Sequence, residues 1–207
     1  MEKPVLFSGP MVRAILSGTK TQTRRVLKGT PIFGCMRDGM TERWAMDDSG
    51  CHQRFVTVPG MPEQAAEMYK CPHSVGSTMW VKETWRRIMN GYGADVAVEY
   101  RATPRDWTEE SDWHPEDKWR PSIFMPRWAS RINLLVTNVR VERVQDISEA
   151  DAMAEGVCPQ NPCSENMTPL DAREEFEVLW DSINGKKPGR SWADNPWVFV
   201  YEFEVVR

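Results

Sequence analysis

The sequence predicts an α+β fold in which a mostly antiparallel, barrel-like sheet is accompanied by about three helices. Three observations favour this class. Apolar side chains alternate along several short segments, as they do in half-buried strands, and three other segments place apolar residues on one helical face. Strands and helices do not alternate in the regular order that builds a parallel sheet. We expect the 207 residues to form one domain, with an insertion over residues 28–77.

The first helix is expected after a short apolar strand at residues 4–7. Ser8 is a residue type that caps helices, and Pro10 suits a first helical turn. Gly18 ends the helix, because the residue that follows a helix often needs a positive φ, and threonine-rich alternation then indicates a strand that reaches residue 26. The apolar face of this helix consists of Met11, Val12, Ile15 and Leu16.

The middle of the chain divides into an insertion and a set of strands. Residues 28–77 carry many glycine, proline and methionine residues with little periodicity, which indicates an irregular insertion. Residues 103–120 form a polar, tryptophan-rich segment, expected to be a loop or a short helix. Within residues 131–144 the alternation changes phase, which predicts a bulge or a bend. Strands are expected at residues 43–46 and 55–58 inside the insertion, and at 78–85, 96–101, 131–144 and 197–205 outside it.

Two more helices are expected toward the C-terminal end. Ser148 begins a capping-box-like sequence, and the short helix that it opens ends before Gly156. After a loop at residues 158–167, a longer helix is expected to begin at Thr168 and Pro169 and to end at Gly185. Its apolar face consists of Ala172, Phe176, Leu179, Trp180 and Ile183.

The charge of the chain limits its partners. A formal net charge of -4 argues against nonspecific coating of nucleic acid, which requires a basic field, although it permits a local basic patch. The sequence has no apolar run of about 18 residues and no secretion signal. We therefore expect no membrane partner and a cytoplasmic location.

Cysteine and tryptophan are the residue types that suggest additional sites. Five cysteines without a CxxC pair argue against a disulfide framework, and neither Cys51-His52 nor Cys71-Pro72-His73 fits a common zinc pattern. No metal or other cofactor is expected. Six of the ten tryptophans lie in the middle of the chain, where they either fill the core and its rim or form a surface on which a base stacks. These six are Trp80, Trp85, Trp107, Trp113, Trp119 and Trp128.

The segment SGTKTQTRR, residues 17–25, places three cations and three threonines directly behind a serine and a glycine. One interpretation is a solvated basic turn, in which Lys20, Arg24 and Arg25 pair with surface carboxylates. The other interpretation is a functional site, because none of these side chains is suited to fill an apolar core. The residues themselves leave both interpretations open.

This segment resembles the signature of the ASCH domain family, which runs Gly, any, Lys, any, any, Glu or Thr, any, Arg. Gly18, Lys20, Thr23 and Arg25 occupy these positions here. DISEADAMAEGV, residues 146–157, resembles the second characteristic stretch of the family. With WVKETW and PRWASRI, the set is similar to a group of longer, phage- or prophage-type ASCH proteins. The resemblance implies a PUA-like fold, a small β-barrel associated with RNA.

One branch of the family hydrolyses the acetyl amide of N4-acetylcytidine with a lysine, a threonine three residues later and a glutamate in the second stretch. At matching positions the resemblance implies that Lys20, Thr23 and Glu155 are catalytic, on a modified nucleoside or single-stranded RNA. Threonine at the position where many members have glutamate is the choice of that branch. Two alternatives remain: a noncatalytic RNA-binding module and a metal-independent ribonuclease. No protein partner is indicated.

Amide hydrolysis needs a nucleophile, a proton acceptor and a donor to the leaving amine. A threonine hydroxyl is a weak nucleophile until a base takes its proton, and a lysine can do so only when desolvation or a nearby cation lowers its pKa. Residues three apart on an ideal strand point to opposite faces. Lys20 and Thr23 therefore converge only if Lys20 belongs to the turn after Gly18.

The candidates for binding substrate or RNA combine cations with aromatic rings. Arginine contacts phosphate and an aromatic ring stacks on a base, so the mixture suits single-stranded RNA. It equally suits a barrel rim where arginine stems cover tryptophans. The candidates are Gly18, Arg24, Arg25, Trp80, Lys82, Glu83, Trp128 and Arg131.

Overall fold

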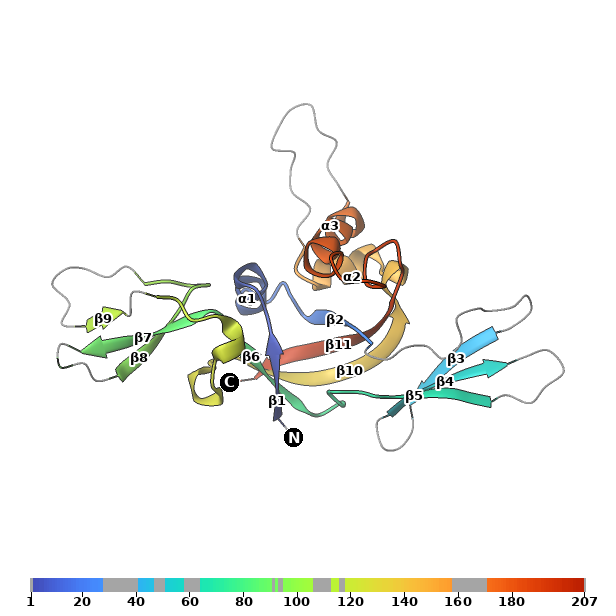
Figure 1. Ribbon diagram of the computed structural model, residues 1–207, viewed down its shortest axis with the longest axis horizontal. Helices are drawn as coiled ribbons and strands as arrows, with labels where there is room; N and C mark the ends of the chain where they lie inside the picture. Colours follow the sequence, from blue (N-terminus) through green and yellow to red (C-terminus); the bar gives the residue numbers. More distant parts are fainter. Residues whose placement is uncertain are drawn as a thin grey trace, which may run out of the picture.

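The computed structural model describes residues 2–27, 41–46, 51–57, 64–90, 92, 95–105, 113–115, 118–157 and 171–206. In these residues the chain forms three α-helices and several strands in mixed sheets, so the expected α+β class is confirmed (Figure 1). None of the described helices is long and apolar enough to cross a membrane.

A five-stranded sheet forms the centre of the molecule. Its order is β1 (Glu2–Leu6), β6 (Thr78–Lys82), β10 (Asn133–Arg143), β11 (Trp197–Val206) and β2 (Gln22–Val26). β1 pairs with β6 in parallel, and every other pairing in this sheet is antiparallel. The long strands β10 and β11 curve strongly (Figure 1).

The curvature of this sheet brings its two edge strands near each other. β10 has a register shift between Val136 and Asn138, which confirms the bend predicted from the change of phase. The edge strands β1 and β2 approach where Arg25 Nη2 donates a hydrogen bond to the Leu6 carbonyl at 2.8 Å. β1 and β2 are not paired in the described residues, so the sheet there is open.

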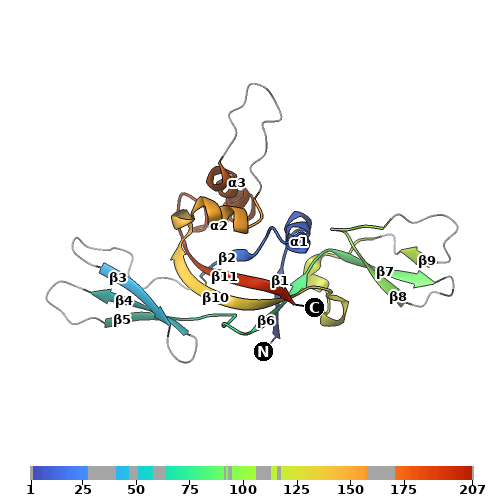
Figure 2. The ribbon, with the colours of Figure 1, turned by 180° about the vertical axis from the view of Figure 1, so that it is seen from behind.

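Two smaller sheets extend from opposite ends of the central one (Figures 1 and 2). β3 (Thr41–Met46), β4 (Cys51–Thr57) and β5 (Gln64–Lys70) form an antiparallel sheet inside the expected insertion, which is therefore not irregular throughout. The sequence QAAEMYK lacks clear alternation, and for this reason β5 was not expected. The second sheet has the order β8 (Asp95–Tyr100), β7 (Trp85–Asn90) and β9 (Trp113–Pro115).

Other expected boundaries also need correction. The strand predicted over residues 78–85 is two strands, because Glu83 and Thr84 interrupt it between β6 and β7. The segment 103–120 contributes β9, and its residues 106–112, 116 and 117 lie outside the described residues. The loop expected at 158–167 also lies outside them.

Side chains of β11 alternate between two separate cores. Phe199, Tyr201 and Phe203 point into a core that also holds Val12 and Ile15 of α1 (Gly9–Leu16). Val198 and Val200 pack on the other face against α2 (Glu149–Ala154) and α3 (Ala172–Asn184). The C-terminal strand predicted from alternation is confirmed and is buried on both sides.

The helices begin and end close to the expected residues, with four differences in their caps, their bounds and their apolar faces. Ser8 stands at the N-cap of α1 but makes no side-chain capping bond, and Leu16 at the end of this helix is 47% exposed. α3 begins at Ala172, because Asp171 and Glu174 form its capping box, so the start expected at Thr168 is wrong. Ile183 on the expected apolar face is also exposed. Ser148 is the N-cap of α2, as predicted, and its Oγ accepts from the Asp151 amide at 3.1 Å.

Candidate active site

The turn after α1 places Lys20 against the end of α2. Gly18 has a φ of 79°, which ends α1, and Lys20 lies in the turn before β2 begins. Lys20 forms an isolated antiparallel bridge with Glu155, and the Thr21 amide donates to the Ala154 carbonyl at 2.8 Å. Lys20 therefore belongs to the turn after Gly18, which is the condition that the sequence set for its approach to Thr23.

A second glycine permits this close approach. Gly156 has a φ of 84°, a conformation that L side chains rarely adopt. A Cβ at this position would lie 2.9 Å from Ala14 Cβ and 3.1 Å from Lys20 Cβ. The end of α2 can thus contact both α1 and the Lys20 turn only because residue 156 has no side chain.

Glu155 lies between two buried cations. Lys20 Nζ donates to Glu155 Oε2 at 2.6 Å and to the Glu155 carbonyl at 2.7 Å, while Arg24 Nη1 donates to Glu155 Oε1 at 3.2 Å. The side chains of Lys20 and Arg24 have no exposed area, and that of Glu155 has 4%. The interpretation of this segment as a solvated surface turn is therefore wrong for Lys20 and Arg24.

Arg24 also connects the site to strand β10 and helix α2. Its Nη2 donates to Glu142 Oε1 at 2.6 Å and lies 3.4 Å from Asp151 Oδ2. Gln22 Nε2 donates to Asp151 Oδ1 at 2.7 Å, and Arg140 contacts the same carboxylate at 3.1 Å. These partners are not predictable from the sequence, because nothing in the spacing indicates that β10 and α2 lie on the same side of β2.

Burial changes the acid–base properties of Lys20. Loss of hydration lowers the pKa of its ammonium group, the attraction and hydrogen bond of Glu155 partly oppose this, and the charges of Arg25 and Arg24 lower it further. The pKa of Lys20 is below its usual value as a result. The direction is the one that a lysine needs in order to accept a proton near neutral pH.

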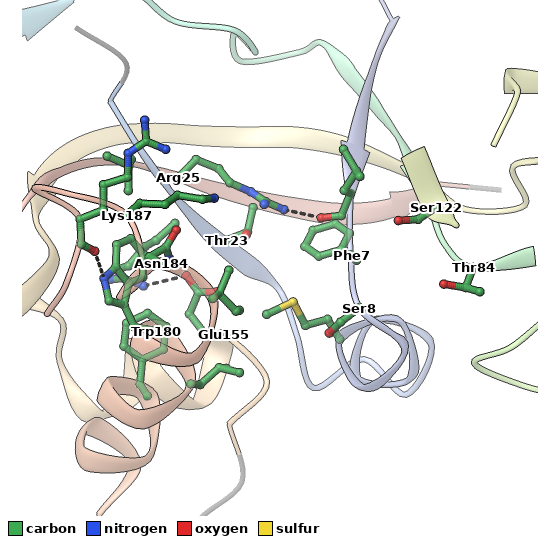
Figure 3. Close-up of a pocket in the computed structure, with 18 residues that line it drawn as sticks. Phe7, Ser8, Thr23, Arg25, Thr84, Ser122, Glu155, Trp180, Asn184 and Lys187 are labelled. Carbon is green, nitrogen blue, oxygen red and sulfur yellow. Dashed lines mark hydrogen bonds and ion pairs between the residues drawn. The ribbon is translucent and has the colours of Figure 1, made fainter. Parts of the chain in front are cut away.

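A pocket of about 590 Å³ opens beside this cluster, between α1 and α3. Such a volume is typical of small-molecule sites. Figure 3 shows Ser8, at the start of α1, and Trp180, on α3, on opposite sides of it. Thr23 and Glu155 both line the pocket, so the structure brings the expected nucleophile and the expected carboxylate to one cavity. Lys20 is not among the residues that line the pocket, and it lies next to it through its contact with Glu155.

Arg25 contributes a positive charge on the side of Thr23. Its guanidinium lies 5.1 Å from the centre of the Phe7 ring, and within the described residues its buried Nε has no hydrogen-bond partner. Burial lowers the pKa of Arg25, but an arginine keeps its proton in proteins at neutral pH. Lys187 and Arg190 line the pocket near the C-terminal end of α3.

The remaining expected binding residues do not line this pocket. Arg131 makes a bidentate ion pair with Glu83 at 2.9 and 3.0 Å, and Lys82 donates to the Ile123 carbonyl at 2.8 Å. Trp80 is buried, whereas Trp128 is 64% exposed and packs edge-on against Trp85 at 5.8 Å. Gly18 acts through its conformation. Contact of these residues with RNA stays a prediction.

Comparison of the chain with protein-family models, with curated proteins and with solved structures found no match. Among the described residues, no group of three or more histidine, cysteine, aspartate or glutamate side chains is placed to hold a metal ion. The geometry of the site therefore carries the functional argument.

Proposed function

We propose that this protein is an amidohydrolase that removes an acyl group from the exocyclic amine of a modified pyrimidine such as N4-acetylcytidine. The observation that carries this proposal is the buried contact of Lys20 with Glu155, at 2.6 Å, beside a pocket that Thr23 lines. This arrangement would supply a nucleophile from Thr23, and a base and an acid for the leaving group from the Lys20–Glu155 pair.

The reaction follows from these three side chains. Thr23 Oγ attacks the acyl carbon, and its proton passes to Lys20. The carbon–nitrogen bond then breaks, and the Lys20–Glu155 pair returns a proton to the leaving amine. Water attacks the resulting acyl-threonine ester, which releases the carboxylic acid and restores the Thr23 hydroxyl. The positive charge of Arg25 lies on the same face of β2 as Thr23, where negative charge develops on the acyl oxygen.

The buried pair suits this proton transfer. Burial lowers the pKa of the Lys20 ammonium group, so its neutral amine is more accessible than that of an exposed lysine. The contact of 2.6 Å between Lys20 Nζ and Glu155 Oε2 gives the proton a direct path. Lys20 then accepts from Thr23 as a neutral amine.

We further propose that the fold is a PUA-like barrel of the ASCH type. The support is the curvature of β10 and β11, the contact of Arg25 with Leu6 between the two edge strands, and the core that this sheet encloses. Residues 28–77 would then be an insertion, since β3, β4 and β5 form a sheet of their own.

The test is turnover of N4-acetylcytidine by the wild type and by Lys20→Met, with cytidine measured by chromatography. The variant keeps the length of the buried side chain, and we expect its rate to fall by about 100-fold or more, as for loss of a general base. Lys186→Met, on the exposed C-terminal side of α3, is the matched control. Circular dichroism checks the fold of each. Normal turnover by folded Lys20→Met would refute the proposal.

A second candidate is RNA binding without catalysis, which the cations at one end of the pocket favour. Arg25, Lys187 and Arg190 line it, and Lys187 is exposed. Binding of single-stranded RNA would weaken with salt, with a slope of about -0.7 per phosphate contacted. A slope that is smaller by about 0.7 in Lys187→Ala, with no turnover by the wild type, would favour this candidate over the first.

A further inference from the structure

β2 is an edge strand, and its hydrogen-bond register shows which of its backbone N–H and C=O groups have no partner in the sheet. The Phe203 amide donates to the Thr21 carbonyl at 2.9 Å, and the Leu27 amide donates to the Trp197 carbonyl at 3.0 Å. The pairing between these two bonds is uninterrupted, from Gln22 opposite Glu202 to Val26 opposite Val198. Odd-numbered residues of β2 therefore bond to β11, and even-numbered residues direct their N–H and C=O groups away from the sheet.

Two of these even-numbered residues, Arg24 and Val26, line the pocket. Arg24 as a residue is 5% exposed, whereas its side chain has no exposed area, so the accessible part of Arg24 is its backbone. Among the described residues, the backbone N–H and C=O groups of Arg24 and Val26 have no hydrogen-bond partner outside the sheet. Two backbone donors and two backbone acceptors are thus left at the stretch of β2 that lines the pocket.

The walls beside this edge are apolar and come from two directions. Phe7 follows β1 and Trp180 belongs to α3 (Figure 3). Met11 of α1 and Leu179 of α3 also line the pocket. Buried polar backbone groups next to apolar walls select a flat ligand whose rim carries hydrogen-bonding atoms and whose faces are apolar. A heterocyclic base has these properties.

The same edge is too short for an added peptide strand. At its start the Thr21 amide is already bonded to the Ala154 carbonyl, and the Lys20–Glu155 bridge covers the next position. Of the β2 residues whose backbone groups point away from the sheet, only Arg24 and Val26 line the pocket. Strand addition depends on a row of main-chain hydrogen bonds, whereas a single ring needs two.

We infer that the backbone edge of Arg24 and Val26 reads the Watson–Crick edge of a cytosine-type ring, with the Arg24 carbonyl accepting from the exocyclic N–H and the Val26 amide donating to N3. This inference rests on the proposed function for its orientation. Glu155 and Lys20 lie at the start of β2, so the exocyclic amine and its acyl group face that end, and N3 follows along the strand toward Val26.

The assignment explains discrimination between pyrimidines. Cytosine offers an acceptor at N3 and a donor at its exocyclic amine, whereas uracil offers a donor at N3 and an acceptor at O4. With uracil, the N3–H donor would face the Val26 N–H donor, and the O4 acceptor would face the Arg24 carbonyl acceptor. An unsatisfied buried backbone group lowers affinity on the order of 10-fold.

The experiment measures binding of cytidine, 3-deazacytidine and uridine by NMR titration of the amide-labelled protein. Cytidine is expected to bind on the order of 10-fold more tightly than either analogue and to shift the Val26 amide resonance most strongly. Equal binding of cytidine and 3-deazacytidine, or no binding of cytidine, would overturn the inference. A shift of the Val26 amide by a blocked tetrapeptide of alternating valine and threonine, without one by cytidine, would also overturn it and indicate strand pairing.

Val26→Pro tests the same hydrogen bond from the protein side. Proline removes an amide that the sheet does not use, and edge strands tolerate proline where the missing N–H faces outward. Val26→Ala loses the side chain and keeps the amide, so the comparison isolates the N–H. Val26→Pro is expected to lose the preference for cytidine over 3-deazacytidine. Retention of that preference in folded Val26→Pro would contradict the assignment, and if this variant does not fold the wild-type comparison decides.

Turnover separates this inference from the proposed function. If the protein prefers cytidine in binding but does not hydrolyse N4-acetylcytidine, the catalytic proposal is refuted and the recognition of the ring by the β2 backbone still stands. A protein that hydrolyses N4-acetylcytidine but binds cytidine and 3-deazacytidine equally refutes only the reading.

Discussion

Glu155→Gln tests the electrostatic balance at the centre of the site. The substitution keeps the shape of the side chain and removes the charge that lies between Lys20 Nζ, at 2.6 Å, and Arg24 Nη1, at 3.2 Å. Arg24 retains Glu142 and Asp151. Lys20 has no other carboxylate among the described residues, so the cost falls mainly on this lysine.

The size of the effect follows from the burial of Lys20. Removing one partner of a buried ion pair costs about 3–5 kcal/mol. The folded variant can avoid part of this cost by releasing the lysine proton, which from an ordinary pKa of about 10.4 costs roughly 4.6 kcal/mol at pH 7 and roughly 1.9 kcal/mol at pH 9. The loss of stability is therefore about 3–4.5 kcal/mol at pH 7 and about 2 kcal/mol or less at pH 9.

The sign of the pH dependence is set by proton binding. Burial lowers the pKa of Lys20 in the folded protein, so the unfolded chain binds more protons between that pKa and about 10.4, and stability rises with pH over this interval. Without Glu155 the folded pKa falls further and the slope becomes steeper. Urea unfolding at pH 7 and at pH 9 measures both values, with Glu149→Gln at the exposed start of α2 as the control. A loss below about 1 kcal/mol at pH 7, or one that does not change with pH, would refute this reasoning.

Three further predictions use other parts of the structure. Gly156→Ala is expected to lower the melting temperature by about 4–8 °C, because the new side chain combines a positive φ with a 2.9 Å approach to Ala14. The control, Gly76→Ala, also has a positive φ of 78° but its Cβ meets no atom within 4 Å, so its melting temperature should fall less. Equal shifts in the two variants would contradict this prediction. Burial, with the charges of Lys3 and Arg25, lowers the pKa of His73 to about 4. The unfolded chain therefore binds more protons than the folded protein between about pH 6.5 and pH 4, and stability should fall as the pH drops through this range. NMR titration of the imidazole measures this pKa, and a midpoint near 6.5 would be inconsistent with the burial of His73. Glu83→Gln removes the bidentate partner of Arg131 and should destabilise the fold by about 3 kcal/mol, measured by urea unfolding. The affinity for cytidine should be unchanged. A loss of that affinity would instead place Glu83 at the pocket.

Local patterns predicted the elements whose causes are local. The alternation over residues 197–205 reflects two cores on the two faces of β11, and the change of phase in 131–144 reflects the shift after Val136. The turn at Gly18 was predicted from its residue type alone, because a positive φ is a property of one residue. These features need no knowledge of distant contacts.

Competing local signals and distant contacts explain what the sequence did not predict. The start of α3 depends on a capping box between Asp171 and Glu174, which competes with an equally plausible start at Thr168. The partners of Arg24 come from β10 and α2, more than 100 residues away, and their approach is decided by strand order. The position of Glu155 beside Lys20 was expected only through a resemblance, since neither spacing nor composition relates two residues 135 positions apart.

The alternation of β2 divides the basic segment into two functions. Gln22 and Arg24 point toward α2 and β10, where they bind Asp151 and Glu142 and are buried. Thr23 and Arg25 point to the other face, and Arg25 lies against Phe7. The even positions therefore hold the strand against the helix that carries Glu155, and the odd positions present a hydroxyl and a charge to the pocket. A substitution such as Arg24→Met acts first on stability, because it leaves Glu142 and Asp151 without their buried cation. Thr23→Val keeps the β-branched shape and removes the hydroxyl, so under the proposed mechanism it is expected to act mainly on turnover, which separates the chemistry of this segment from its structural role.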